Sequence, residues 1–309
     1  MMRLTVPFLC IALASPFALA SSAQAALDTA RIEQIIGVKG TMISEENVFK
    51  VTKARSDVKV EVESWSMPPF MGLGSWAAFK TDSEGMTMVM GDTVLFEDEV
   101  NPVMSVALDS GLEVTALHNH FFFDEPKVFF LHIAGMGDET KLAQGVKNIW
   151  DKISQIRAAN PVPAKSFSGH AIAAKNAITP EPIEAILGTK GQASQGMFKV
   201  VIGKPASMHG TSIGKEMGVN TWAAFAGSDQ EAVIDGDFAM TEHELQAVLQ
   251  TMRKDGVNIV AIHQHMTGEE PRILFLHYWA KGEAAALARA FKHALDVQAE
   301  LTKHAAVTK

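Results

Sequence analysis

Cysteine is almost absent from this chain of 309 residues, which contains only Cys10. A disulfide framework and a zinc site built from cysteines are therefore excluded. Beyond the N-terminal segment, no stretch reaches the roughly 18 consecutive apolar residues of a membrane-spanning helix, so we expect no transmembrane segment in the mature chain. A glycine-rich phosphate loop, a nucleophile elbow and an H-E-x-x-H motif are also missing.

Long runs of one charge are absent too. The 35 Asp and Glu residues outnumber the 27 Lys and Arg residues, and the net charge is −8. An acidic chain without a basic stripe argues against nucleic acid as a partner. With 47% hydrophobic residues, the chain can build one large or two medium cores. A small-molecule ligand or substrate stays open as a partner, and so does the oligomeric state.

The N-terminal segment has the order of a secretory signal peptide. Arg3 precedes the apolar run Leu4–Ala20, and Ala23–Ala25 (Ala-Gln-Ala) has the small-x-small pattern of a cleavage site. We expect residues 1–25 to be removed, with cleavage near Ala25, and the mature protein to be periplasmic or secreted. The single cysteine lies inside the apolar run rather than at its end, which argues against a lipid anchor. An earlier cleavage site and a buried N-terminal helix are the alternatives.

The chain is internally duplicated, and this is its strongest signal. Ordered segments of the first half recur in the second at an offset that drifts from 151 to 145, so small gaps fall in loops. The matched pairs include Ile32–Gly40 with Ile183–Gly191, Ser75–Phe79 with Thr221–Phe225, His118–His120 with His263–His265, Glu125–Lys127 with Glu270–Arg272, and Phe130–His132 with Phe275–His277. We therefore assign residues 26–157 to repeat 1, residues 158–177 to a proline-containing linker, and residues 178–309 to repeat 2.

The sequence of each repeat predicts the same order of helices and strands. A short helix follows Asp28 or Thr179, both good N-cap types. The sequence then predicts extended segments, a second helix, two strands and a closing helix. In repeat 1 these last elements are expected at 97–110, 112–123, 127–134 and 138–157, and the helices of repeat 2 at 241–255 and 283–301. Strands paired through a short turn and mixed with helices indicate an α+β fold, here two homologous repeats, each an antiparallel sheet with helices, related by a pseudo-two-fold.

Three histidines in each repeat are placed to meet on one sheet face. Alternate residues of a strand share a face, so His118 and His120 point the same way. If residues 124–126 form a three-residue turn, paired residues sum to 250, which puts His132 directly opposite His118. The same arithmetic about Glu270 gathers the second set, which consists of His263, His265 and His277. A change of one residue in the turn would send the third histidine to the other face.

Three converging imidazoles can share one metal ion. Three histidines and an open position are typical of a catalytic zinc site, although imidazole also suits copper, iron and manganese. We therefore expect a divalent transition metal, with zinc as the first candidate. The alternative is that each histidine is a hydrogen-bonded core residue.

Carboxylates are candidates for a further ligand in each repeat. The spacing His118-x-His120-x4-Glu125 is similar to the first cupin motif, in which the glutamate is a ligand. Glu125, like Glu270, is expected at the turn apex, roughly 16 Å along a regular strand from the histidines, so a structural role in the turn competes with ligation. Asp92 and Asp237 each follow a glycine in a strand and are the other carboxylate candidates.

Two further patterns have less specific meanings. Met86, Met88 and Met90 place three thioethers on one strand face, where soft sulfur ligands would suit Cu(I). The stripe is not repeated in the second half, and we expect core packing instead. Trp76 and Trp222 lie in Trp-Ala-Ala-Phe strands, where we also expect core packing, with a ligand stack as the alternative.

The paired His-x-His, Glu-Pro-[Lys/Arg] and Phe-Leu-His blocks, each with Trp-Ala-Ala-Phe upstream, resemble the LppY/LpqO family of exported bacterial proteins. The resemblance spans essentially the whole mature chain. It implies export and duplication, but that family has no established activity. Some of its members are named as lipoproteins, and the lipobox is missing here, so anchoring does not carry over.

Two functional hypotheses follow from these residues. The first is an exported bacterial metal-binding protein with one three-histidine site per repeat, such as a metal-dependent hydrolase. The second is a non-enzymatic duplicated module that binds a ligand or has a structural role, with the histidines in its core. Repeat 2 is the better candidate for catalysis, because residues 266–268 (Met-Thr-Gly) crowd its histidines less than the three phenylalanines at 121–123.

Overall fold

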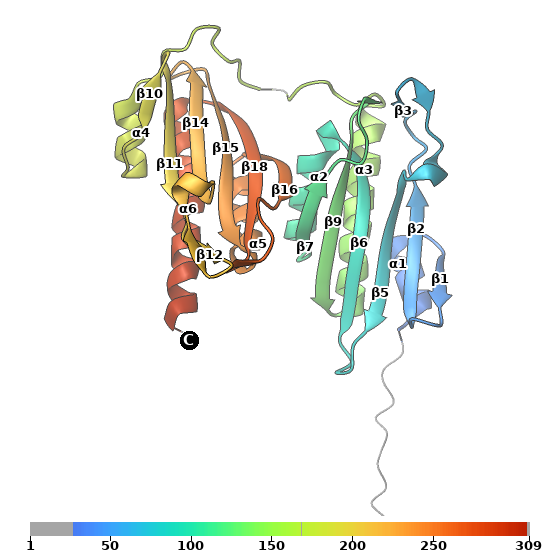
Figure 1. Cartoon of the computed structure of the whole chain (residues 1–309). Coiled ribbons are helices and arrows are strands. Elements are labelled where there is room, and N and C mark those ends of the chain that lie inside the picture. Colours follow the sequence, from blue (N-terminus) through green and yellow to red (C-terminus); the bar gives the residue numbers. More distant parts are fainter. Residues whose placement is uncertain (1–26, 168, 308–309) are drawn as a thin grey trace, which may run out of the picture.

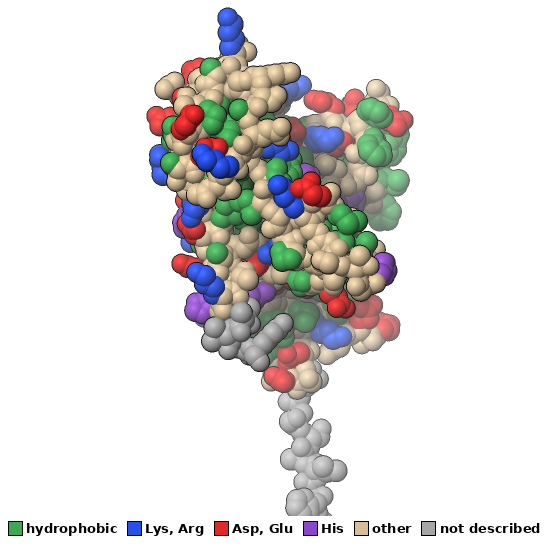
Figure 2. All heavy atoms as spheres, turned by 60° about the vertical axis from the view of Figure 1, so that its left-hand side comes forward, with side chains coloured by type: hydrophobic (Ala, Val, Ile, Leu, Met, Phe, Trp, Pro, Cys, Tyr) green, Lys and Arg blue, Asp and Glu red, His purple; other side chains and the backbone are tan. Residues whose placement is uncertain are grey.

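The computed structural model describes residues 27–167 and 169–307, so the expected signal peptide, residues 1–25, lies outside the described residues. Two halves of the same α+β construction lie side by side (Figure 1). Their strands are antiparallel throughout the large sheet, as the sequence predicts. In the view of Figure 2, acidic and basic side chains are interspersed over the visible face.

Repeat 1 contains three helices, a long sheet and a small sheet. Its elements are α1 (Thr29–Ile36), β1 (Gly40–Ile43), β2 (Val48–Ala54), β3 (Glu61–Val62), β4 (Trp65–Ser66), the 3-10 helix η1 (Pro69–Met71), β5 (Gly74–Thr81), β6 (Thr87–Phe96), α2 (Glu97–Asp109), β7 (Glu113–His118), β8 (Asp124–Glu125), β9 (Val128–Gly137) and α3 (Glu139–Ala159).

Repeat 2 follows the same order. Its elements are α4 (Pro180–Leu187), β10 (Gln192–Ser194), β11 (Met197–Gly203), β12 (Ala206–Met208), β13 (Thr211–Ile213), the 3-10 helix η2 (Lys215–Met217), β14 (Asn220–Gly227), β15 (Ala232–Thr241), α5 (Glu242–Lys254), β16 (Asn258–His263), β17 (Glu269–Glu270), β18 (Ile273–Gly282) and α6 (Ala284–Val307). No helix of the described residues is long and apolar enough to cross a membrane.

The two halves share one sheet of 12 strands in the order β1-β2-β5-β6-β9-β7-β16-β18-β15-β14-β11-β10. This order reads the same from either end once each strand is replaced by its equivalent in the other repeat. At the centre, β7 pairs antiparallel with its own equivalent, β16, through Leu117 and Ile262. Two-fold symmetry requires that the strand at the centre pairs with its own equivalent, as β7 does with β16. The pseudo-two-fold axis therefore passes between these two strands.

Local sequence explains where the helices begin and end. Asp28 caps α1 by accepting a hydrogen bond from the backbone N–H of Arg31, at 2.9 Å. The carboxylate of Glu244 accepts a hydrogen bond from the backbone N–H of Thr241 at the start of α5, as in a capping box. Gly111 and Gly256, which follow α2 and α5, have φ values of 76° and 77°, a left-handed conformation that glycine adopts without strain.

In the part of the chain that the structure describes, the α-helices cover one face of the long sheet, and the main core lies there. Figure 1 shows the long helices α3 and α6 running along the back of the two halves. On the opposite face, the small sheet β4-β3-β8 covers one end of repeat 1 and packs over buried residues that include Val94, Phe96, Val128 and Phe130. Strands β6 and β9 therefore pass from a covered end to an open end on this face.

The connection between β7 and β9 is longer than the expected three-residue turn. β8 pairs with β3 rather than turning directly into β9, and the peptide bonds before Pro126 and Pro271 are cis. In the observed register His118 pairs with Phe130, and His132 pairs with Ala116. The predicted direct pairing of His118 with His132 is therefore wrong by two residues. The shift is even, so the histidines stay on one face.

The expected core packing of the methionine stripe is also wrong. Met86, Met88 and Met90 are all exposed, because they lie on the open face beyond the small sheet. Alternation along β6 places Val89 in the core and its neighbours outside. The sequence does not show which face the helices cover, because apolar residues lie on both faces of this segment, methionines on one and Val89 on the other.

Candidate metal centre

The six histidines lie where the small sheets end and the open face begins. His118 and His263 are the last residues of β7 and β16, and His132 and His277 lie within β9 and β18. Two residues beyond each strand end come His120 and His265. Strand pairing adds an acid to each group, because Asp92 of β6 pairs directly with His132, and Asp237 of β15 pairs directly with His277.

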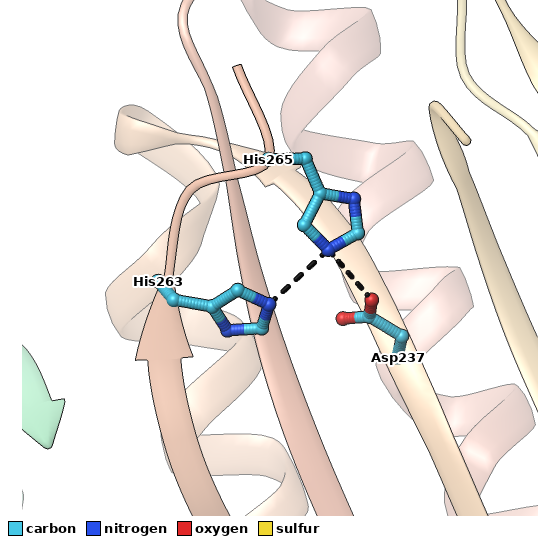
Figure 3. Close-up of side chains that lie close together, drawn as sticks. All are labelled: Asp237, His263 and His265. Atoms are coloured by element: carbon cyan, nitrogen blue, oxygen red, sulfur yellow. Dashed lines mark hydrogen bonds and ion pairs between the residues drawn. The ribbon is translucent and has the colours of Figure 1, made fainter. Parts of the chain in front are cut away.

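The group in repeat 2 brings ligand-type atoms closest together. Nε2 of His265 lies 3.1 Å from Oδ2 of Asp237 and 3.1 Å from Nε2 of His263 (Figure 3). One potential ligand atom from each of these three residues lies within 4.8 Å of the other two. Nδ1 of His277 is 4.0 Å from Oδ1 of Asp237, and its ring centroid is 4.5 Å from that of His263. His277 therefore borders the group.

In repeat 1 the histidines interact mainly with one another. Nε2 of His118 and Nε2 of His132 are 2.9 Å apart, and the ring centroids of His118 and His120 are 5.1 Å apart. The structure thus brings each set of three imidazoles together on one face. Only repeat 2, within the described chain, also presents an acid and two imidazoles at mutual ligand distance.

A phenylalanine supports one imidazole in each repeat. The ring of His120 stacks on Phe130 with centroids 3.6 Å apart, and His265 stacks on Phe275 at 3.5 Å. Both phenylalanines are fully buried beneath the small sheets. This stacking fixes the plane of a histidine that lies outside the regular strand. Sequence reasoning missed the role of Phe130 and Phe275, although strand parity already places them on the histidine face.

Burial shapes the protonation of the group. Desolvation raises the pKa of the Asp92 and Asp237 carboxyls, while the neighbouring histidines oppose that rise. Desolvation and two neighbouring imidazoles lower the pKa of His263 to about 4. Desolvation, followed by the nearby His118, also lowers the pKa of His120. Neutral imidazole, the form that binds metal, is therefore favoured at His263 and His120.

Unpartnered buried atoms fit the donor set to a metal ion. Among the buried side-chain atoms of the described residues that have no hydrogen-bond partner are Oδ1 of Asp92 and Oδ1 of Asp237. Buried polar atoms without partners cost free energy, and coordination would satisfy such atoms. Carboxylate oxygen and imidazole nitrogen are ordinary ligands of zinc and related divalent ions. The residues of repeat 2 therefore fit a divalent transition metal.

The two glutamates considered as extra ligands lie elsewhere. Glu125 is exposed and makes an ion pair with Lys165, with Oε1 3.2 Å from Nζ. Glu270 is also exposed and is not part of the group formed by Asp237, His263 and His265. Their neighbours Asp124 and Glu269 are the buried acids, and each accepts a hydrogen bond from a backbone N–H of the following strand. Asp92 and Asp237, rather than Glu125 and Glu270, are thus the acidic residues that lie beside the histidines.

A tryptophan stands beside the acid in each repeat. Trp76 pairs with Asp92 and Trp222 pairs with Asp237, on the strand next to the acid. Both rings are only partly buried on the open face, so the expectation of core packing is wrong for them as well. A lysine ammonium lies over each ring, 4.3 Å from the centroid for Lys50 over Trp76 and 3.9 Å for Lys199 over Trp222.

The family model described as Domain of Unknown Function (DUF1259) matches the chain twice, over residues 30–152 and 181–297. The chain belongs to this family. The two matches coincide with the two halves of the DUF1259 fold and confirm that the domain is duplicated. No curated protein matches the sequence.

Two solved structures with some similarity to this DUF1259 chain are described as shell proteins. One is described as a trimeric bacterial microcompartment shell protein PduB, with 12% identity, coverage of 85% of this chain and 92% of that chain, and a TM-score of 0.21. Another is described as the fused permuted hexameric shell protein MSM0275 from the RMM microcompartment, with 12% identity, coverage of 69% and 85%, and a TM-score of 0.18.

Proposed function

We propose that this DUF1259 protein binds a divalent transition metal, with zinc as the first candidate, through Asp237, His263 and His265. The observation that carries the proposal is the position of His265 Nε2, 3.1 Å from both the Asp237 carboxylate and His263 Nε2. A cation bound between the two imidazole nitrogens and the carboxylate oxygen would stabilise this close arrangement. His277 borders the group and is the candidate fourth donor, because its Nδ1 lies 4.0 Å from Oδ1 of Asp237.

The same arrangement supports hydrolysis as the chemistry of the site. Three protein ligands that leave a coordination position open are typical of catalytic rather than structural zinc sites. A bound divalent ion would supply Lewis-acid polarisation of a substrate oxygen. The residues of the chain have separate roles. Asp237, His263 and His265 would hold the ion, and Phe275 stacks beneath His265 and keeps water from that side of the ring. His265 is exposed on the open sheet face, from which a small molecule would approach.

We further propose that the protein is exported. The order of Arg3, the apolar run Leu4–Ala20 and the Ala-Gln-Ala pattern at 23–25 supports removal of residues 1–25. The resemblance to the LppY/LpqO family, through the paired histidine blocks, supports the same location. A periplasmic or secreted protein without disulfides would depend on its large core for stability.

Metal binding to purified protein tests the proposal most directly. After chelation and dialysis, zinc titration followed by calorimetry and by elemental analysis should give a tight site that Asp237→Asn and His263→Ala each remove. His243→Ala provides the matched control, because His243 is exposed on α5 away from the group. Equal zinc binding by all four proteins would overturn the proposal.

A non-enzymatic role is favoured only for repeat 1. There, among the described residues, no carboxylate and two imidazoles lie at mutual ligand distance, and the shortest contact joins Nε2 of His118 to Nε2 of His132 at 2.9 Å. We infer that this group stabilises the junction of β7 and β9 as a structural element. Loss of stability in His132→Phe without any change in zinc stoichiometry would support this role, whereas loss of bound zinc would refute it.

A further inference from the structure

Repeat 1 exposes four methionines together at the open end of its sheet. The exposed fractions are 46% for Met86, 38% for Met88, 55% for Met90 and 52% for Met136. Large apolar side chains gathered on a surface usually mark a binding site. These four lie beyond the small sheet, on the face that the helices leave uncovered.

Strand geometry places three of these thioethers within reach of one point. Met88 of β6 pairs directly with Met136 of β9, so their Cβ atoms are about 4.5–5.5 Å apart. Met90 is the next residue on the same face of β6, about 7 Å further along. Methionine has three flexible side-chain bonds, so three sulfur atoms on this spacing can converge.

The fold does not require methionine at these positions. The equivalent residues of repeat 2 are Val233, Asp235 and Lys281, in the same strand pairing. That part of repeat 2 is partly covered by the linker, because Lys281 Nζ donates a hydrogen bond to the carbonyl of Phe167, at 3.1 Å. Repeat 1 leaves the equivalent face open and lines it with sulfur instead.

We infer that Met88, Met90 and Met136 form a binding site for a soft monovalent cation, Cu(I) or its analogue Ag⁺. Uncharged thioether sulfur selects Cu(I) over harder ions such as zinc. Lys80 pairs with Met88 on the same face, and its positive charge repels a divalent ion twice as strongly as a monovalent one. Charge and ligand softness therefore favour the same class of ion.

This thioether site is separate from the histidine and aspartate group. The neighbouring group is that of Asp92 and the histidines of repeat 1: Met90 lies two residues before Asp92 on β6, so the two adjoin on one sheet face but share no ligand. The proposed zinc site of Asp237, His263 and His265 lies in repeat 2. Imidazole and carboxylate donors suit divalent ions, while the thioethers suit Cu(I). The inference does not rest on the proposed zinc site, and either can fail without the other.

Silver titration of the metal-free, full chain carrying Cys10→Ser tests the inference, because this change removes the one thiol, which would bind Ag⁺ more tightly than thioethers. The variant Met88→Leu/Met90→Leu/Met136→Leu keeps apolar surface and volume but removes all three sulfur atoms. The matched control is Met42→Leu/Met217→Leu, which replaces two other exposed methionines outside the cluster. We expect the unmodified chain and the control to bind one Ag⁺ alike, and the triple variant to bind at least about tenfold more weakly.

Methyl resonances locate the bound ion. With methionine methyl groups labelled, Ag⁺ should shift the signals of Met88, Met90 and Met136 and leave those of Met42 and Met217 in place. Asp92→Asn should not alter this response. Unchanged Ag⁺ affinity in the triple variant, or Ag⁺ binding that leaves the methyl signals of Met88, Met90 and Met136 in place, would overturn the inference. The inference would also be overturned if the chain bound no Ag⁺ at these methionines and only self-associated, and if the triple leucine variant self-associated equally.

Discussion

Asn101 and Gln246 are equivalent residues of the two repeats, and each clamps the backbone of the other repeat. The Asn101 amide accepts from the N–H of Ile259 at 2.7 Å and donates to its carbonyl at 3.1 Å. The Gln246 amide does the same to Val114, at 3.0 and 2.9 Å. Val114 and Ile259 sit at the register shifts of β7 and β16, where the sheet ladder leaves these backbone groups unpaired. The reciprocal clamps therefore join the halves across the pseudo-two-fold axis.

Removing a clamp should destabilise the whole chain. In Asn101→Ala the buried N–H and C=O of Ile259 lose their partners, and each such group costs about 1–3 kcal/mol. We expect Asn101→Ala, and likewise Gln246→Ala, to lower the free energy of unfolding by about 2 kcal/mol or more in urea titrations. Gln144→Ala, on the exposed face of α3, is the control and should stay within about 0.5 kcal/mol of the unmodified chain. Clamp variants as stable as this control would contradict the role.

Acid should destabilise the metal-free protein partly through His263. Its pKa is about 4 in the folded chain, against 6.5 for an ordinary histidine, so between these values the unfolded chain binds more protons. The stability contributed by the neutral imidazole is complete above pH 6.5 and is lost as the pH falls toward 4. Burial raises the pKa of the neighbouring Asp237, which titrates in the opposite sense.

The comparison that isolates His263 is between variants rather than between pH values alone. With chelator present, urea unfolding at pH 7 and pH 5 should show a smaller acid loss for His263→Gln than for the unmodified chain. His243→Gln should behave like the unmodified chain, because that side chain is exposed. An identical pH dependence in all three proteins would mean that His263 is not held neutral by the fold.

The two adjacent acids of β17 should differ sharply on substitution. Glu269 is buried and accepts a hydrogen bond from the N–H of Ile273 at 3.0 Å, whereas Glu270 is exposed. We expect Glu269→Ala to cost about 1–3 kcal/mol of unfolding free energy. Glu270→Ala should cost less than about 0.5 kcal/mol and leave zinc binding unchanged. Loss of zinc in Glu270→Ala would restore that residue as a ligand.

The two histidine groups should differ in metal affinity. Repeat 2 holds Asp237 and two imidazoles at mutual ligand distance, whereas His118 and His132 of repeat 1 are directed at each other. His265→Ala should therefore abolish the tight zinc site, while His120→Ala, its exact equivalent by sequence, should preserve it. Zinc calorimetry on both variants measures the difference. Equal losses in the two variants would show that the repeats bind alike.

Export should leave a defined N-terminus. If residues 1–25 form a signal peptide, protein recovered from the periplasm or medium begins at Ala26, and intact-mass spectrometry reads this directly. Replacement of Ala25 by a large residue should block or shift the cleavage. Recovery of intact Met1 on the envelope-associated protein would count against the assignment.

Much of this architecture was accessible from sequence because it is encoded locally. The helix limits near Asp28 and Thr241 follow from capping residues, and the left-handed glycines at 111 and 256 mark helix ends. The shared face of His118 and His120 follows from the two-residue period of a strand. The duplication needed only a comparison of the chain with itself, and it alone implied that both histidine groups would be built in the same way.

Tertiary structure decided the remaining features, because they depend on contacts between distant segments. Pairing of β8 with β3 lengthened the loop and moved His118 opposite Phe130, a change that no local pattern records. The same ladder placed Asp92 and Asp237 beside the histidines and Glu125 outside them. Helices pack on only one face of the sheet, which left Met88 and its neighbours exposed. An apolar strand with the same alternation can bury either face, so only the packed chain determines which face becomes the core and which becomes the site.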